Sequence, residues 1–325
     1  MASNAGTFTT YEAKGNREDL ANMIYNISPT DTPFMSMAKR GKATNRVFEW
    51  QTDSLATAAS NTQLEGDSPS SQTAVPTARL FNTVQISSKT FEVSGTQQAM
   101  NPAGRADELA YQLVKRGKEL KRDMETSLTG NTAYAVGTTA AARVSAGLES
   151  WMSTNWTTSG VSVGASASNG FSTVGTVVAV DNTVQGTVSE ANIQAVIRAC
   201  WTQGGNPDTI MVGPFNKTKL SGFSGLVGMT NNIFQKAGGQ ATLIAAVDAY
   251  QSDFGALKII PNRFNRDRTV CVLDFEYWEV AYLRPFQSFP LAKDGDSEKR
   301  MILAEYGLKS LNQAASGKVT DCTTS

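Results

Sequence analysis

One tract restricts more than any other how this chain can fold. Residues 54–79, SLATAASNTQLEGDSPSSQTAVPTAR, contain almost no large apolar side chains. They follow the stretch RVFEWQTD, in which Phe48 and Trp50 alternate with polar residues as in a β-strand. Because a structureless loop of this length is uncommon inside a compact domain, we expect two strands that project from the body as a long hairpin arm.

The returning strand of this hairpin is predicted over residues 80–93, LFNTVQISSKTFEV. Its apolar side chains change face between Ile86 and Phe91, so we expect the register to flip near Ser87 and Ser88. A bulge there would let the arm change direction where it leaves the body.

The N-terminal residues are expected to form a second arm. Residues 16–28 have the period of an amphipathic helix that Pro29 closes. Thr32 and Pro33 then predict the start of a one-turn helix with a basic end at 39–41. The apolar face of the first helix consists of Leu20, Met23, Ile24 and Ile27.

The strongest helix pattern covers residues 103–130. At about 1.5 Å per residue, this helix would span on the order of 40 Å as a half-exposed strut. Gly117 lies inside its apolar stripe, which suggests the close approach of another backbone. The stripe consists of Leu109, Leu113, Gly117, Leu120, Met124 and Leu128.

The remaining chain predicts a mixed structure. Residues 131–188 favour loops and short strands, and 189–205 favour a helix whose buried face includes Cys200 and Trp201. Residues 247–264 are typical of strand, turn and strand. A central strand over 299–312 is expected to precede a polar, loose tail. The predicted class is α+β.

The absence of histidine limits the chemistry of the chain. Ser-His-Asp and Cys-His catalysis and His-ligated zinc are excluded. Cys200, Cys271 and Cys322 are odd in number and widely spaced, which predicts unpaired thiols and assembly in a reducing cytoplasm. We predict no cofactor and no metal site.

Charge and hydropathy exclude further classes. Lys+Arg and Asp+Glu both number 29, so no net charge attracts nucleic acid or an acidic membrane. No apolar run approaches the roughly 20 residues of a membrane span. The stretch MASNAGTFTTYEAKG lacks the basic and apolar regions of a signal peptide.

Carboxylates offer the only candidate catalytic groups. Asp253 begins a DFG triplet, but without the other kinase motifs a turn between strands is favoured. On a strand, Asp274 and Glu276 share a face that Glu279 does not, so surface solvation is favoured over acid–base catalysis. A histidine-independent enzyme acting through these groups or Asp248 remains an alternative of a different class.

Elements that cannot bury themselves within one chain usually bury against copies of it. Five stretches also resemble, in order, the major capsid proteins of a group of tailed bacteriophages. Several separate stretches that agree in order are more specific than any single motif. They are SPTDTPFMSM, FEWQTDSLA, ARVSAGLESWMSTN, VDAYQSDFGALKIIPNRF and VLDFEYWEVAYLRPF.

The resemblance implies the Hong Kong 97-type capsid fold. It implies an N-terminal arm over 1–40, an extended hairpin loop over 41–95, and a peripheral domain with a spine helix over 96–150. An axial domain would follow over 151–282. Residues 283–325 would complete the peripheral domain and end in a C-terminal tail.

The resemblance also implies a structural protein rather than an enzyme. Such subunits form hexamers and pentamers that close into an icosahedral or elongated phage head around double-stranded DNA, assembled in the host cytoplasm. We expect scaffolding and portal proteins as partners, a decoration protein as a further candidate, and no sequence-specific DNA binding. A protein-cargo shell of the same fold and a β-rich tail or fibre component remain alternatives.

The hairpin and the N-terminal arm are expected to contact neighbouring subunits. The apolar faces would supply area and the charged groups would set the register. The predicted contact residues are Leu20, Met23, Ile24, Ile27, Phe34, Arg46, Phe48, Trp50, Glu65, Asp67, Arg79 and Lys89.

Overall fold

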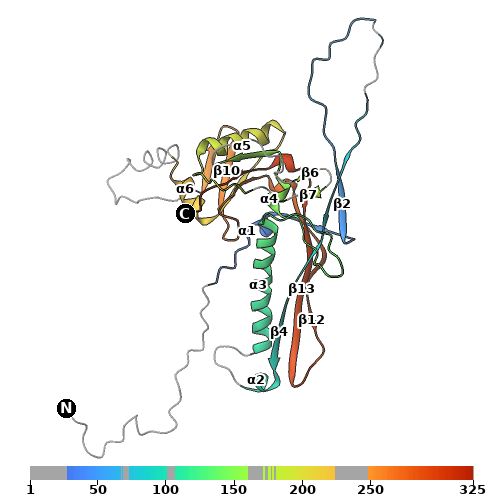
Figure 1. Ribbon diagram of the computed structural model, residues 1–325, viewed down its shortest axis with the longest axis vertical. Coiled ribbons are helices and arrows are strands. Elements are labelled where there is room, and N and C mark those ends of the chain that lie inside the picture. The colour runs from blue at the N-terminus through green and yellow to red at the C-terminus, as the bar shows by residue number, and fades with distance from the viewer. Residues whose placement is uncertain are drawn as a thin grey trace, which may run out of the picture.

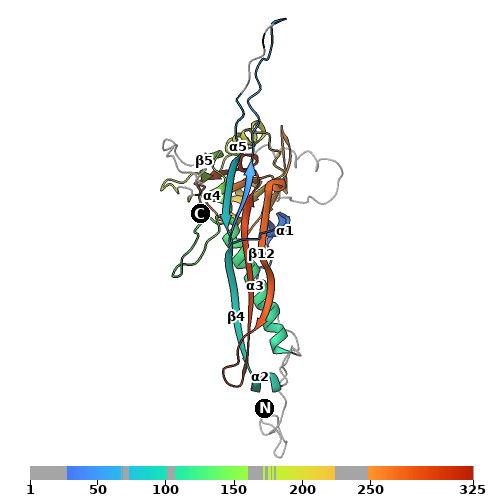
Figure 2. The same cartoon turned by 90° about the vertical axis from the view of Figure 1, so that its right-hand side faces the viewer.

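The computed structural model shows an elongated molecule with a compact lobe, a stalk of long strands and a projecting hairpin (Figures 1 and 2). The predicted helix face from Leu20 to Ile27, and Asp67, lie outside the described residues. The structure describes residues 28–66, 68, 73–100, 107–159, 171–172, 175–176, 178, 181–223 and 248–324.

The stalk is a four-stranded sheet with the strand order β1-β12-β13-β4. Strand β1 pairs with β12 in parallel, and the other pairs are antiparallel. The long neighbouring strands form a continuous surface, and helix α3 lies along it (Figure 1). The strands are β1 (Lys39–Lys42), β12 (Trp278–Pro290), β13 (Ser297–Ser310) and β4 (Gln85–Ser94).

Helix α3 (Glu108–Thr129) is the predicted spine helix. The side chain of Asp107 caps it by accepting a hydrogen bond from the Leu109 N–H at 2.8 Å. Leu120, Met124 and Leu128 are buried, which confirms the apolar stripe in this half of the helix. The close approach predicted at Gly117 is wrong, because no described atom outside the neighbouring helix backbone lies within 4 Å of a Cβ placed there.

The lobe is built on a six-stranded sheet with the order β5-β14-β11-β8-β10-β9. Helix α5 (Glu190–Thr202) packs against it, capped by Ser189, with Cys200 fully buried. Trp201, predicted to be buried, is 56% exposed. The strands are β5 (Asn155–Thr158), β14 (Gly317–Thr320), β11 (Val270–Leu273), β8 (Thr209–Val212), β10 (Gly255–Pro261) and β9 (Ala249–Ser252).

The C-terminal segment is not the loose tail that its polarity predicts. It forms the buried strand β14, which pairs with β5 and β11 in the lobe. Strand β12 begins at Trp278 and belongs to the stalk. The two sheets therefore do not separate at residue 282, and the division into named domains stays a prediction.

The hairpin consists of β2 (Val47–Thr52) paired with β3 (Ala78–Thr83). The predicted returning strand is interrupted at Val84, whose N–H donates to the carbonyl of Arg46 at 2.9 Å. Val84 is buried whereas Ile86 is 47% exposed, so the face changes here and not near Ser87. The reason is that the chain leaves one sheet at this point and enters another.

Helix α1 (Pro33–Met37) confirms the predicted helical turn, but the basic stretch after it is strand β1 rather than a helix end. No described helix combines the length and apolar character required to cross a membrane. The shorter elements are α2 (Gly95–Ala99), α4 (Leu148–Trp151), α6 (Pro214–Ser221), β6 (Phe171–Ser172), β7 (Gly175–Thr176), and 3-10 turns η1 (Phe275–Tyr277) and η2 (Gln313–Ala315).

Candidate assembly surfaces

The base of the hairpin is anchored in the core of the chain. Trp50 stacks on Phe48 with ring centroids 5.8 Å apart and lies 5.4 Å from Trp151. Its indole N–H donates to the carbonyl of Ser310 at 2.8 Å. Both aromatic side chains of β2 are buried, with 9% of Phe48 and 8% of Trp50 exposed. The alternation read from the sequence is confirmed, but it faces this chain's own core.

Asn82 adds a polar anchor on β3 that sequence reasoning missed. Its amide N–H donates to the carbonyl of Leu308 at 2.6 Å, and its amide oxygen accepts from the Ala146 N–H at 3.1 Å. The residue is fully buried, so these bonds replace those that it would make with water. No local pattern marks Asn82, because Leu308 lies 226 residues further along the chain.

The distal part of the hairpin is far more exposed than its base. Beyond β2 and β3 the arm extends away from the lobe in both views (Figures 1 and 2). Leu55 is 99% exposed, Leu64 80% and Val75 78%. Gly66 has a φ of 85° at the tip, a conformation that favours glycine. A long arm with exposed apolar side chains is typical of a surface that another chain covers.

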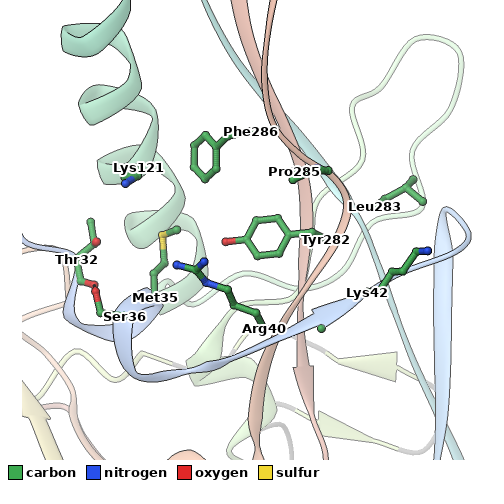
Figure 3. Close-up of a pocket in the computed structure, with 11 residues that line it drawn as sticks. Thr32, Met35, Ser36, Arg40, Lys42, Lys121, Tyr282, Leu283, Pro285 and Phe286 are labelled. Atoms are coloured by element: carbon green, nitrogen blue, oxygen red, sulfur yellow. The ribbon is translucent and has the colours of Figure 1, made fainter.

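A cavity of about 540 Å³ opens beside the stalk, between α1, β1, α3 and β12 (Figure 3). Two register shifts in β12, on either side of Arg284, change the direction of the strand there. The lining combines apolar and cationic side chains. It consists of Thr32, Met35, Ser36, Arg40, Gly41, Lys42, Lys121, Tyr282, Leu283, Pro285 and Phe286.

A buried carboxylate fixes the start of α1 next to this cavity. Glu125 of α3 accepts hydrogen bonds from the backbone N–H groups of Phe34 at 2.8 Å and Met35 at 3.0 Å. It also accepts from the amide of Asn262 at 2.7 Å. Thr32, the expected cap of α1, makes no side-chain cap, so Glu125 supplies it from another helix. Burial raises the pKa of Glu125, and these three donors oppose the rise.

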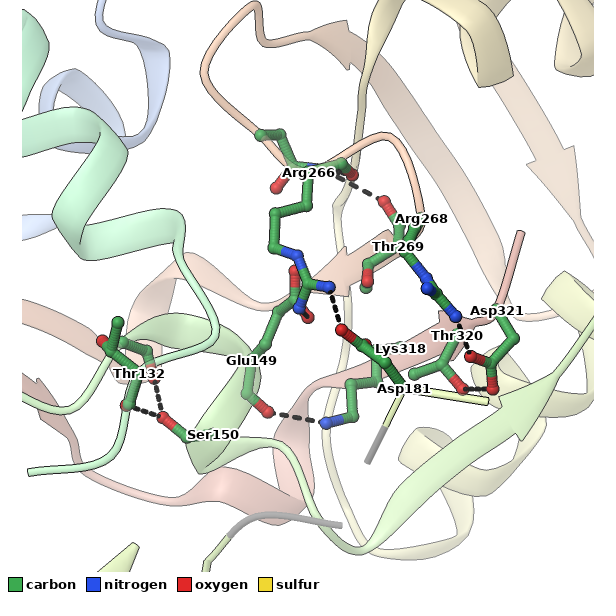
Figure 4. A network of polar contacts seen from close by, with 12 residues as sticks. Thr132, Glu149, Ser150, Asp181, Arg266, Arg268, Thr269, Lys318, Thr320 and Asp321 are labelled. Atoms are coloured by element: carbon green, nitrogen blue, oxygen red, sulfur yellow. Dashed lines mark hydrogen bonds and ion pairs between the residues drawn. The ribbon is translucent and has the colours of Figure 1, made fainter. Parts of the chain in front are cut away.

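Charged groups tie the lobe to the segment before β5 (Figure 4). Arg266 donates to Glu149 at 2.9 Å and to Asp181 at 2.5 Å. Lys318 of β14 donates to the carbonyl oxygen of Glu149 at 2.6 Å. Burial raises the pKa of Glu149, which Arg266 and Lys318 counteract, and burial lowers the pKa of Lys318 to about 8. The network is a structural joint.

The predicted contact residues divide into two groups. Phe34 is fully buried and, like Phe48 and Trp50, is not available as free surface, so the structure contradicts a direct contact role for these three side chains. The reason is that each packs in the core between the stalk and the lobe. Arg46 and Glu65 are exposed and remain candidates.

Two further predicted contact residues make ion pairs inside the chain. Arg79 pairs across the hairpin with Glu49, with the Arg79 Nε 2.8 Å from the carboxylate. Lys89 pairs with Asp123 of α3 at 2.6 Å. Both retain exposed atoms, so they also remain candidates for contacts between subunits.

The carboxylates considered for catalysis do not form one site. Asp274 caps the turn η1 by accepting from the Glu276 N–H at 3.1 Å, whereas Glu279 pairs with Lys309 in the stalk. Asp253 lies in the turn between β9 and β10, as predicted, and Asp248 pairs with Lys217. No metal-binding cluster is present among the described residues.

The fold matches that of viral shell subunits. The capsid of a native GTA particle aligns over 99% of this chain and 100% of that chain, with a TM-score of 0.60 at 10% identity. The structure from Gordonia phage Cozz covers 98% and 96%, with a TM-score of 0.59 at 11% identity. These likenesses show the fold, and they confirm the Hong Kong 97-type α+β architecture predicted from the sequence.

Sequence comparison then specifies the family. The family model described as SU10 major capsid protein matches residues 4–323. The major capsid protein of Escherichia phage Phieco32 is 30% identical over 343 aligned positions, covering 97% of each chain. The chain therefore belongs to the SU10 major capsid protein family. It is a structural protein of a phage capsid, not an enzyme.

The same fold also occurs in an encapsulin. The holo-SrpI encapsulin complex from Synechococcus elongatus PCC 7942 has a TM-score of 0.52 at 7% identity and covers 94% of this chain and 92% of that chain. At this identity the likeness concerns the fold alone. The relationship by sequence is to phage capsid proteins, which favours the capsid over the cargo shell.

Proposed function

We propose that copies of this chain assemble into hexamers and pentamers that close around double-stranded DNA, in the cytoplasm of the host. The observation that carries this proposal is the distal hairpin, where Leu55, Leu64 and Val75 stay exposed on an arm anchored at its base. A subunit that buries these side chains against each neighbour gains interface area around the whole ring.

Each segment of the chain has its own proposed role in the shell. The hairpin lies over a neighbouring subunit, residues 1–40 act as an arm that holds another, and the stalk and lobe form the peripheral and axial parts of the shell. A separate scaffolding protein sets the curvature, a portal protein occupies one vertex, and a decoration protein is a candidate for the outside. DNA is enclosed without recognition of its sequence.

Electron microscopy of the overexpressed chain, alone and with the candidate scaffolding protein, tests assembly. We expect rings, tubes or closed shells, and light scattering gives their mass. A chain that stays monomeric with the scaffolding protein present would contradict the proposal. Nuclease-protected DNA in particles from infected cells separates the capsid from a cargo shell, which would contain protein instead.

A deletion of residues 55–78 tests the hairpin directly. Because Phe48 and Trp50 lie outside the deleted segment, the core should remain folded while assembly fails. A matched control replaces the same residues by a Gly/Ser linker of equal length, which keeps the connection and removes Leu55, Leu64 and Val75. Normal closed shells from either variant would exclude the proposed role of the arm.

A further inference from the structure

The ion pairs of the stalk are distributed unevenly between its strands and its helix. Every lysine and arginine of β4, β12 and β13 has a carboxylate partner in the described part of the chain. The pairs are Lys89 with Asp123, Arg284 with Glu305, Lys299 with Glu92, Arg300 with Glu298 and Lys309 with Glu279. In α3, by contrast, Arg116 pairs with Glu119, and the other cations of the helix have no ion-pair partner among the described residues. They are Lys115, Lys118, Lys121 and Arg122.

Lys115, Lys118 and Arg122 lie on one side of α3, because they follow one another at spacings of three and four residues. Lys115 and Lys118 are exposed and Arg122 is half-buried, whereas Leu120 and Met124 on the opposite side of the helix are buried. Figures 1 and 2 show α3 lying along the stalk sheet, so the cationic side faces away from the sheet. We call these three cationic residues the basic strip.

The basic strip borders a hollow of about 110 Å³, whose other side is the segment 28–30. This volume is several times the roughly 30 Å³ that one water molecule occupies in the liquid, so the hollow admits a partly hydrated phosphate group. The guanidinium group of Arg122 lies 5.6 Å from the centre of the Phe264 ring, a contact that favours its position at the hollow.

Acidic residues near the basic strip leave its positive charge in place. Glu119, a carboxylate that lines the hollow, pairs with Arg116 at 2.7 Å, and Asp123 pairs with Lys89 at 2.6 Å. Asp31 follows the segment that borders the hollow and is exposed, a single negative charge against the three cations of the strip. This side of α3 is therefore locally cationic, although Lys+Arg and Asp+Glu both number 29 in the whole chain.

A row of cations of this kind suits a polyanion better than a single small anion. From Lys115 to Arg122 the charges extend over about 10 Å at about 1.5 Å per residue. Double-stranded DNA carries one phosphate charge per about 1.7 Å of its axis. Lysine and arginine side chains on a helix surface contact phosphates, which carry no information on base sequence. Copies of the strip repeated over a shell would add their weak contacts to one DNA molecule.

We propose that the basic strip faces the inside of the shell and binds the phosphodiester backbone of the enclosed DNA. The strands of the stalk, whose charges are paired within the chain, take no part in this contact. Because the contact is electrostatic, it weakens with salt and does not depend on base sequence. This inference rests on the proposed shell function and names the surface that meets the contents of the shell.

Lysine reactivity in particles from infected cells tests the contact. DNA-filled shells and shells emptied of DNA are treated with N-hydroxysuccinimidyl acetate, and after denaturation a heavy isotope of the same reagent labels the remaining amines. Mass spectrometry then gives the reacted fraction of each lysine. We expect Lys115 and Lys118 to react at least about threefold more slowly in filled shells, because a lysine bound to phosphate is not free to react. Lys293, an exposed lysine in the loop between β12 and β13, should react equally in both.

The outcomes separate the DNA contact from the shell function. Filled shells in which Lys115 and Lys118 react at the same rate as in emptied shells would overturn the contact and leave the shell function intact. Protection found only in shells that still contain the scaffolding protein would also overturn it, and would assign the basic strip to that protein. Particles from infected cells that contain no DNA would contradict the shell function itself.

The salt dependence of DNA binding provides a second test, on the unassembled chain. Fluorescence anisotropy of a labelled DNA duplex of arbitrary sequence measures the binding constant at several low salt concentrations. Lys115→Gln combined with Lys118→Gln should reduce the slope of log K against log salt by about 1.8, because each lost phosphate contact removes about 0.9. Lys258→Gln combined with Lys293→Gln is the matched control, since both lysines are exposed and the change in net charge is the same. Equal slopes for the two double variants would contradict the assignment of the basic strip.

Discussion

The base and the distal part of the hairpin differ in what covers their apolar side chains. At the base, Phe48 and Trp50 are buried by the chain itself and held by a hydrogen bond to Ser310. Further out, Leu55 is 99% exposed and Leu64 is 80% exposed. One continuous hairpin therefore contains a part that stabilises the subunit and a part that is left for a partner. Stability and assembly can be changed separately.

The largest expected effect lies at the base. Trp50→Ala removes a buried ring and its hydrogen bond to Ser310, and should lower the free energy of unfolding by about 3–5 kcal/mol. Denaturant unfolding of the unassembled chain measures this. Trp50→Phe, which keeps a ring, should lose less. An unchanged midpoint for Trp50→Ala would mean that the base is not part of the core.

Charged groups differ between buried and exposed positions in the same way as apolar groups. The second-largest effect on the free energy of unfolding is expected at buried Lys318. Its pKa is lowered by burial from 10.5 to about 8, so between these values the unfolded chain binds a proton that the folded chain has released. This contribution to stability is fully present above pH 10.5 and is lost as the pH falls through about 8.

Lys318→Met keeps the length of the side chain and removes the titration. The unfolding free energy of the original chain minus that of the variant should therefore rise by about 3 kcal/mol between pH 7.5 and pH 10.5. Denaturant unfolding at several pH values checks it, with exposed Lys258→Met as the control. A difference that stays constant with pH would contradict the burial of this charge.

A smaller effect is expected where charges are exposed on the hairpin. Arg79→Ala removes the pair with Glu49, both partners being in contact with water, and should cost about 0.2–1 kcal/mol. Salt should reduce this loss further. Arg268→Ala is the comparison, because its partner Asp321 is only 2% exposed and loses its counter-charge in a buried place. Equal losses of unfolding free energy for Arg79→Ala and Arg268→Ala would contradict the distinction between exposed and buried ion pairs.

The smallest effect on stability is expected at the tip. Leu64→Ser should change the unfolding free energy by less than about 0.5 kcal/mol, since the side chain is exposed in the free subunit. The same substitution should reduce the yield of shells, measured by sedimentation. Val84→Ser, at a fully buried position, should instead lower the free energy of unfolding of the subunit.

The sequence predicts an element well where the repeat of its apolar residues alone determines which face is buried. The alternation around Phe48 and Trp50 placed both on one face of β2, and the stripe through Leu120 and Met124 identified the buried side of α3. Ser189 caps α5 by accepting a hydrogen bond from the Asn192 N–H, three residues further along the chain. In each case the relevant partners are a few residues apart.

The contacts that the sequence does not predict depend on distant partners. Glu125 lies on α3, but Phe34 and Asn262, which donate to it, are 91 and 137 residues away. The sequence predicts a contact of Trp50 with a neighbouring subunit, because it does not show that Trp50 lies against Trp151 and donates to Ser310. The repeat of apolar residues predicts which face of a helix or strand is buried. It does not predict which residues pack against that face.

Glu125 also connects three parts of the subunit mechanically. Its carboxylate accepts the N–H groups of Phe34 and Met35 at the start of α1, and it accepts from Asn262 beside the lobe. A force applied to α1 is therefore passed to the spine helix through this carboxylate and through the packed ring of Phe34, which lies 5.7 Å from the ring of Phe275. Such a force meets a few contacts close together, whereas a force along β12 and β13 is shared by a long ladder of hydrogen bonds.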